Sequence, residues 1–211
     1  AIAALPGLRI LRQDPWDCLL SYLCSPWNNI PKIELSTERI ARRWGTVREF
    51  ERAEGHVEVA CLPSPETLAQ VAPEELRACA LGYRCPYLSA TAVRVARGEI
   101  SPMALRRAPY EEALAVLLRL PGVGRKVADC VLLFSLDKYE AFPVDVWVRR
   151  ILHERYGTEL TAWLPDLAAR RERPLSPMEH RALVRFAWQR WGALAGYAQE
   201  YLFFARRRGL L

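Results

Sequence analysis

Leu120-Pro-Gly-Val-Gly-Arg-Lys-Val-Ala-Asp-Cys130 joins two apolar segments through a very short turn. Residues 110–119 before it and 127–134 after it carry apolar side chains at helical spacing, which predicts two buried helices. Pro121 ends the first helix, and the glycines that follow can adopt positive φ and let another backbone come close. The stretch therefore predicts a helix–hairpin–helix.

The turn also predicts an anion site made of backbone. Val123, Gly124 and the next residues place N–H groups at the start of the second helix, where the first donors lack intrahelical acceptors and the helix dipole is positive. Arg125 and Lys126 add positive charge beside these groups. Such a turn can hold one phosphate of a DNA strand, although similar hairpins also occur in DNA-binding proteins that catalyse no reaction.

Asp145 is a second chemical feature, downstream of the turn. It follows Phe142-Pro143-Val144 and precedes another apolar, arginine-bearing segment, so it is placed to cap the start of a helix. A lysine at the start of one helix and an aspartate at the start of the next could share one pocket. Taken alone, Asp145 could be only a helix cap, and Lys126 could be only a phosphate contact.

Together these motifs resemble the helix–hairpin–helix DNA glycosylases, specifically the 8-oxoguanine glycosylase and AP lyase branch. The resemblance runs from about Gly7 to Phe203, and it includes Leu11-Arg-Gln-Asp-Pro15, Leu81-Gly-Tyr-Arg84 and Tyr197-Ala-Gln199 besides the two motifs above. It implies an all-α fold in which two helical lobes flank a DNA-binding cleft. We expect the chain to lack the N-terminal domain of the eukaryotic-type enzymes.

The resemblance implies that the chain excises 8-oxoguanine from duplex DNA and then cleaves the strand. As the base leaves, C1′ of the sugar becomes positive, and Asp145 would stabilise that charge while Lys126 attacks C1′. The helix dipole, Arg125 and a desolvated site would all favour an uncharged, nucleophilic amine. The Schiff base that follows permits β-elimination of the 3′ phosphate, whereas relatives without the lysine use water and only remove the base.

The family also assigns residues to the flipped base. Phe203 and Cys130 would pack on the two faces of the purine, Gln199 would bond its Watson–Crick edge, and Pro143 would complete the pocket. Read without the family, each of these residues is ordinary core or helix surface.

DNA contacts around the flipped base are implied in the same way. Tyr83 would wedge into the gap in the stack, and Arg84 would contact the opposite base. The other candidates for DNA contact are Gly122, Val123, Gly124, Arg125, Asn28, Asn29, Lys32, Arg149 and Arg150.

Three positions depart from the family pattern. Trp27 stands where the family has the first asparagine of a run, and Trp147 replaces a histidine that follows the catalytic aspartate motif. Lys32 stands for an arginine that reads the opposite cytosine, and a lysine cannot form the bidentate fork. We therefore expect a weaker preference for cytosine opposite the lesion and the loss of one phosphate contact.

Composition is compatible with this interpretation. The 211 residues are 51% hydrophobic with a net charge of +6, which suits a globular protein with a polyanionic partner without proving one. No apolar run reaches transmembrane length, and the first residues lack a signal-peptide pattern. We expect an intracellular monomer that binds double-stranded DNA containing an oxidised base.

The cysteines do not suggest a metal site. No C-x-x-C pair occurs, and none of the six follows Cys130, so the four-cysteine iron–sulfur cluster of some relatives is not expected. Neither a metal nor a cofactor is expected, and the thiols should be buried in the core. The six positions are Cys18, Cys24, Cys61, Cys79, Cys85 and Cys130.

Helical periodicity extends over almost the whole chain. Helices are expected at about 15–24, 31–44, 65–71, 73–79, 85–97, 102–107, 109–119, 124–136, 146–156, 177–190 and 195–207. Asp14, Ser64, Ser101 and Ser176 precede prolines at helix starts, and Glu179 would complete a capping box with Ser176. Within residues 45–63, Val57-Glu-Val-Ala60 alternates like a strand, but its neighbours also suit a loop.

The family suggests how these helices divide into lobes. Residues 1–32 with 136–211 would form the lobe that carries the catalytic aspartate and the base pocket. Residues 33–135 would form the other lobe and end in the helix–hairpin–helix at 111–135.

The sequence is compatible with two other functions. One is a bifunctional glycosylase for a different oxidised base, against which Cys130, Gln199 and Phe203 argue. The other is a non-catalytic DNA-binding module that uses only the hairpin.

Overall fold

The computed structural model describes residues 3, 5–53, 55–166, 170 and 173–211. The chain divides into two compact units, and each is described by itself. Residues 13–131 form the first, here called the hairpin unit, and residues 1–12 with 132–211 form the second, here called the terminal unit. Helices make up most of the described chain, as expected, with one two-stranded sheet added.

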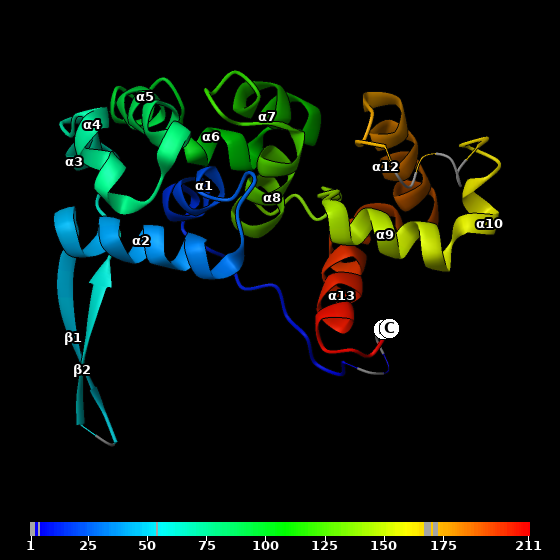
Figure 1. The fold of residues 1–211 in the computed structure, drawn as a ribbon, viewed down its shortest axis with the longest axis horizontal. Helices are drawn as coiled ribbons and strands as arrows, with labels where there is room; N and C mark the ends of the chain where they lie inside the picture. Colours follow the sequence, from blue (N-terminus) through cyan, green and yellow to red (C-terminus); the bar gives the residue numbers. More distant parts are fainter. Residues whose placement is uncertain (1–2, 4, 54, 167–169, 171–172) are drawn as a thin grey trace. The chain divides into compact units, whose positions relative to one another are not determined.

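Among its described residues, the hairpin unit contains seven α-helices, two strands and the first part of an eighth α-helix (Figure 1). These elements are α1 (Pro15–Leu23), α2 (Ile30–Trp44), β1 (Thr46–Arg52), β2 (Gly55–Cys61), α3 (Pro65–Ala69), α4 (Pro73–Leu76), α5 (Cys85–Ala96), α6 (Pro102–Arg107), α7 (Tyr110–Leu117) and α8 (Arg125–Ser135). Two short 3-10 helices, η2 (Arg77–Cys79) and η3 (Gly82–Arg84), connect α4 to α5. Buried side chains that include Leu20, Ile40, Leu68, Leu88 and Leu117 form the core of this unit.

Proline-led helix starts behave as expected in this unit. The Asp14 carboxylate accepts hydrogen bonds from the backbone N–H groups of Trp16 and Asp17, at 2.8 and 3.1 Å. Ser64 and Ser101 cap α3 and α6 in the same manner. These side chains satisfy N–H donors that the first turn of a helix leaves unbonded.

Residues 46–61 form an antiparallel hairpin, which resolves the open choice between strand and loop. Its register runs from Thr46 opposite Cys61 to Arg52 opposite Gly55. All of β1 and most of β2 are exposed, so no buried face imposes alternation over the full length of the strands, and only residues 57–60 alternate. That exposure explains why the pattern was weak.

Helix α1 lies in the hairpin unit, whereas the expected division grouped residues 13–32 with the C-terminal part. α1 packs against α2 and α5, and the indole N–H of Trp16 donates to the Pro63 carbonyl at 2.8 Å. Local packing thus joins α1 to the hairpin unit. The expected cleft between two lobes stays a prediction.

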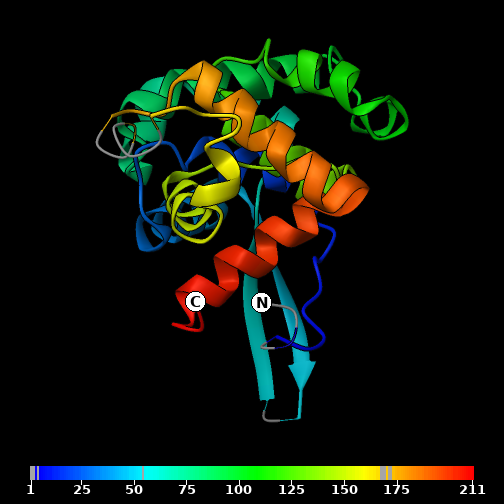
Figure 2. The same cartoon turned by 90° about the vertical axis from the view of Figure 1, so that its right-hand side faces the viewer.

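The terminal unit is built from helices that follow the Asp145 corner. They are α9 (Val146–Arg155), α10 (Gly157–Leu160), α12 (Pro177–Trp191) and α13 (Ala195–Arg207), and the chain turns between the last two at the 3-10 helix η4 (Gly192–Leu194; Figure 2). The ring of Phe142 stacks on Trp191 with centroids 5.9 Å apart. Tyr156 and Phe186 pack edge-on against the same indole and complete an aromatic core.

Most helices end within about two residues of their expected bounds. The short helix α10 was not expected. None of the helices in the described ranges is long and apolar enough to cross a membrane.

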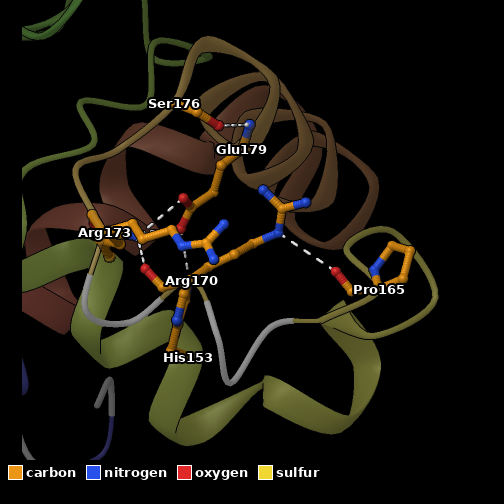
Figure 3. A network of polar contacts seen from close by, with 7 residues as sticks. His153, Pro165, Arg170, Arg173, Ser176 and Glu179 are labelled. Atoms are coloured by element: carbon orange, nitrogen blue, oxygen red, sulfur yellow. Dashed lines mark hydrogen bonds and ion pairs between the residues drawn. The ribbon is translucent and has the colours of Figure 1, made fainter.

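Glu179 of α12 lies in a polar network with Ser176 and with His153 of α9 (Figure 3). Arg149 of α9 belongs to the same network. Its Nε and Nη2 atoms donate to the two carboxylate oxygens of Glu179 at 2.7 and 3.0 Å. The other contacts of the guanidinium are the carbonyls of Arg173, at 2.7 Å, and Arg170, at 2.6 Å. His153 Nε2 lies 3.0 Å from Glu179 Oε1, so α9, α12 and the segment before α12 share one buried charge cluster.

This network changes two expectations. Ser176 accepts from the Glu179 N–H at 3.2 Å, but the Glu179 carboxylate binds Arg149 instead of completing a capping box. Arg149 was a candidate for DNA contact, yet its guanidinium is already bound to a carboxylate that is 1% exposed. We assign Arg149 to the stability of the terminal unit, because a buried carboxylate requires a charged partner.

Arg149→Met should lower the free energy of unfolding by about 3 kcal/mol, because it leaves the buried Glu179 carboxylate without its main partner. Arg150→Met is the matched control: that side chain is exposed and should cost less than about 0.5 kcal/mol. Urea unfolding of both variants measures the difference. Equal effects would show that Arg149 has no special structural role.

Candidate active site

The turn between α7 and α8 depends on Gly122. Its φ is +76°, in the left-handed region, and a Cβ atom built there would lie 2.7 Å from Cδ2 of Tyr87. The expectation of positive φ holds for Gly122 but not for Gly124, whose added Cβ would meet no atom within 4 Å. Gly122 therefore shapes the turn, and Gly124 leaves open space at the start of α8.

The backbone donors of the turn differ in part from those expected. The Val123 N–H bonds the Leu120 carbonyl at 3.2 Å, and the Val123 side chain is buried, so this group closes the turn rather than facing outward. The Gly124 carbonyl accepts from the Ala128 N–H at 3.0 Å and so begins α8. The outward donors are then those at the start of α8, beside the open space at Gly124.

Arg125 is tied to the interior of the helix pair. Tyr110 donates from Oη to Asp129 Oδ1 at 2.7 Å, and Arg125 donates from Nη2 to Tyr110 Oη at 2.8 Å. Arg125 Nε lies 3.3 Å from Asp129 Oδ2. Burial raises the pKa of Asp129 to about 6, although the bonds from Tyr110 and Arg125 oppose that rise. This triad links α7 to the first turn of α8, the turn that carries Lys126.

Lys126 is half-buried, and its amine has a specific partner. Nζ donates to Ser25 Oγ at 3.1 Å, and the Ser25 hydroxyl in turn donates to the Tyr22 carbonyl at 2.8 Å. Nζ also lies 5.0 Å from the centroid of the Tyr22 ring. Ser25 and Tyr22 were not identified from the sequence, because a serine before a proline reads as a turn residue.

The loop that follows Ser25 positions an unusually exposed tryptophan. Asn28 bonds the Cys24 carbonyl at 3.1 Å, and Asn29 caps α2 by accepting from the Lys32 N–H at 3.0 Å. Both asparagines, which are also candidates for DNA contact, thus build the turn. Trp27 between them and Ser25 has φ +52° and is 96% exposed.

Tyr83 and Arg84 lie against the same loop and differ in exposure. Arg84 is buried, and it donates to the carbonyls of Pro26 and Leu81, at 2.9 and 3.0 Å. The exposed ring of Tyr83 lies 4.5 Å from the Arg84 guanidinium carbon. Arg84 therefore supports Tyr83 and the loop internally, whereas it was expected to contact the opposite base. Lys32 is exposed.

Asp145 caps α9 in the terminal unit. Its Oδ1 accepts from the Val148 N–H at 2.7 Å, as expected for a helix cap. Pro143 is buried just before it, and Trp147 is exposed just after it. The site residues thus belong to different units: Lys126 and Cys130, which is buried in α8, lie in the hairpin unit, and Asp145 lies in the terminal unit.

Helix α13 carries Gln199 and Phe203, and its first residues lie against the segment that leads to that cap. The Gly196 N–H donates to the Tyr139 carbonyl at 2.7 Å, and a Cβ at Gly196 would lie 2.7 Å from the Ala141 carbonyl oxygen. The start of α13 is therefore held tightly on the segment that leads to Asp145. Gln199 is 5% exposed, and its Oε1 has no hydrogen-bond partner among the described residues.

No metal site appears among the described residues, since no three histidine, cysteine or acidic side chains cluster there. Five cysteines are buried and Cys61 is partly exposed.

Gly122→Ala should destabilise the chain by about 2 kcal/mol, because it adds left-handed strain and a clash with Tyr87. Gly124→Ala is the matched control and should change stability by less than about 0.5 kcal/mol, since its Cβ meets open space. Thermal unfolding of the two variants checks the contrast. A loss as large for Gly124→Ala would contradict this account of the turn.

Comparison with known proteins agrees with this arrangement. The model of the HhH-GPD superfamily of base excision DNA repair proteins matches residues 27–164. A probable N-glycosylase/DNA lyase of Methanothermobacter thermautotrophicus is 35% identical, over 97% of this chain and 65% of that protein. The N-glycosylase/DNA lyase OGG1 of Arabidopsis thaliana is 36% identical, over 95% of this chain and 52% of that protein.

A solved structure has the same fold. The 8-oxoguanine glycosylase/lyase of Clostridium acetobutylicum, in complex with duplex DNA containing cytosine opposite 8-oxoguanine, superposes with a TM-score of 0.81 at 32% identity. The match covers 99% of this chain and 65% of that one, so this chain spans between about half and two thirds of these relatives. The family match, the glycine turn and the lysine that follows it agree, and the chain belongs to the HhH-GPD superfamily of base excision DNA repair proteins.

Proposed function

We propose that this chain is a bifunctional DNA glycosylase and AP lyase that excises 8-oxoguanine from duplex DNA. The observation that carries the proposal is the Lys126 amine, held by Ser25 at 3.1 Å in the first turn of α8, beside the open space at Gly124. Family membership supports base excision. The relatives named as glycosylase/lyases support the lyase step and the oxidised purine.

The reaction begins when the damaged base leaves the stack. Lys126 Nζ then attacks C1′ while the bond to the base breaks, and the Asp145 carboxylate stabilises the positive charge on the sugar. Ser25 accepts a hydrogen bond from Nζ and so orients the amine. The Schiff base formed after ring opening lets the 3′ phosphate leave by β-elimination.

The base pocket needs groups that recognise a purine. Gln199 supplies a buried amide whose Oε1 has no partner in the described chain, and a base edge would satisfy it. Phe203 and Cys130 would pack on the purine faces, and Pro143 would close the pocket beside Asp145. An amide that is buried and unsatisfied without ligand favours a hydrogen-bonded substrate over a purely apolar one.

Contacts with the surrounding duplex would come from two kinds of group. The N–H groups at the start of α8 and the exposed Lys32 would hold phosphates. The exposed rings of Tyr83 and Trp27 would occupy the stack at the flipped nucleotide. Since an indole stacks on any base, and Lys32 lacks a bidentate fork, we expect tolerance of different bases opposite the lesion.

The partner is double-stranded DNA with an oxidised base, and we expect the protein to act inside the cell as a monomer. A different oxidised base is the alternative substrate. A non-catalytic hairpin module is the alternative of another class, and it would use the hairpin turn without the amine of Lys126.

Lys126→Gln should abolish both base excision and the borohydride-trapped adduct on a duplex with 8-oxoguanine opposite cytosine, because the amide cannot form a Schiff base. Lys138→Gln, a second lysine of the chain, serves as control and should still be trapped. Excision and trapping are also measured on undamaged, abasic and oxidised-pyrimidine duplexes.

The pattern across these duplexes separates the alternatives. An adduct on abasic DNA but not on 8-oxoguanine would leave the lyase and refute the proposed substrate. DNA binding without any adduct would favour the hairpin module.

Trp27→Ala should lower single-turnover excision of 8-oxoguanine by about tenfold, because stacking at a vacated site contributes about 1–3 kcal/mol. Strand cleavage at an abasic site should change less, since no base must be held out. Stability should stay within about 0.5 kcal/mol, as the side chain is almost wholly exposed. Trp27→Phe retains a ring and should keep most of the activity; equal loss in both variants would refute stacking.

A further inference from the structure

We propose that Glu200 is a second catalytic acid of the site, which gives its proton to the base as it leaves. The inference rests on the proposed function, and it adds a proton donor to a reaction in which Asp145 and Lys126 act on the sugar. The proposed steps of Lys126 and Asp145 do not involve this residue.

Helix periodicity places Glu200 beside the base pocket. It precedes Phe203 by three positions and therefore lies on the same side of α13 as that ring, and Gln199 precedes Phe203 by four positions. The start of α13 is fixed against the segment before Asp145 by the Gly196 N–H bond to Tyr139, at 2.7 Å. The position of Glu200 relative to that segment is therefore set by backbone contact within one unit.

Glu200 also lies within electrostatic range of Asp145. α13 packs against α9, the helix that Asp145 caps, and the negative charge of Asp145 contributes to the raised pKa of the Glu200 carboxyl group. Arg207, on the same side of α13, is the other charged group that acts on it, and its guanidinium carbon lies 5.9 Å from the Phe203 ring centroid. Glu200 is thus part of a cluster of one base-stacking ring, two carboxyl groups and one guanidinium.

The two carboxyl groups have different environments. Burial raises the pKa of Glu200 and Asp145 raises it further, while Arg207 opposes the shift. Asp145, by contrast, accepts a hydrogen bond at Oδ1 from the Val148 N–H group, at 2.7 Å. Two neighbouring carboxyl groups whose environments differ in this way suit separate tasks, one as proton donor and one as charge stabiliser.

Glu200 is also available for such a task. Within the described chain, neither a hydrogen bond nor an ion pair engages its carboxyl group, although it is only partly exposed. By contrast, Glu154 of the adjacent α9 is bound to Arg206 of α13. A half-buried acid without a structural partner, next to a base-binding amide, is a functional candidate.

The step balances without any other reactant. The C1′–N9 bond breaks with its electron pair on the base, and the bond between Lys126 Nζ and C1′ forms. The Glu200 proton passes to the departing base and makes it a neutral leaving group. Glu200 remains as a carboxylate and regains a proton from water after the base has left.

Glu200→Gln tests the proposal, because the amide keeps the shape and the hydrogen-bonding capacity but cannot give up a proton. Single-turnover excision of 8-oxoguanine should fall by about 10²-fold, the usual contribution of a general acid. Strand cleavage of a preformed abasic site should change by less than about twofold, because no base leaves in that reaction. Glu154→Gln is the matched control and should retain full excision.

The pH profile gives the readout that a structural role would not move. As the pH rises, the wild-type excision rate should include a limb that falls when Glu200 loses its proton, and Glu200→Gln should lack that limb. Excision and pH profile unchanged in Glu200→Gln would overturn the proposal. Equal losses of excision and abasic cleavage would also overturn it, in favour of a structural role.

Failure of the underlying function would look different. It would appear in the wild-type protein itself, as no excision and no trapped adduct on any duplex, and it would overturn both proposals.

Discussion

The packing of Gly122 on the ring of Tyr87 is the constraint on which the rest of the site depends. Only a residue without Cβ can hold φ at +76° this close to an aromatic ring. Glycine at this position therefore allows the tight chain reversal between α7 and α8. The reversal puts the start of α8 at the surface and makes Lys126 a first-turn residue. The Tyr110–Asp129–Arg125 triad then locks α7 to that same turn. One glycine and one buried aspartate thus fix the position of the amine.

Some arginines of the chain form ion pairs with buried carboxylates and are not free to bind another molecule. Arg125 is paired with Asp129 and Arg149 with Glu179, so these guanidinium groups hold helices in place, although the sequence suggested DNA contacts for both. Arg84 likewise bonds backbone carbonyls of the hairpin unit. Under the proposed function, the groups that would meet DNA are the backbone N–H donors at α8, the exposed rings, Lys32 of α2 and exposed arginines such as Arg150. The affinity for DNA would then depend on the positions of these groups as much as on the net charge of +6.

The sequence predicted the helices, their proline-led caps and the turn, because each follows from local rules: apolar spacing, Asp14 and Ser64 as caps, and a glycine at positive φ. It could not predict what Glu179 or Arg149 bind, since those partners meet only after α9 and α12 pack. Ser25 was missed for the same reason: it is about a hundred residues from Lys126, and nothing in Ser-Pro-Trp signals an amine partner. The exposed hairpin at 46–61 gave a weak pattern because no face of it is buried.

The most direct test of the account is a crystal structure of the borohydride-trapped complex with an 8-oxoguanine duplex. The account predicts a covalent bond from Lys126 Nζ to C1′, with the Asp145 carboxylate against the same sugar and Trp27 within the base stack. A bond from another amine, or Asp145 remote from the sugar, would contradict it.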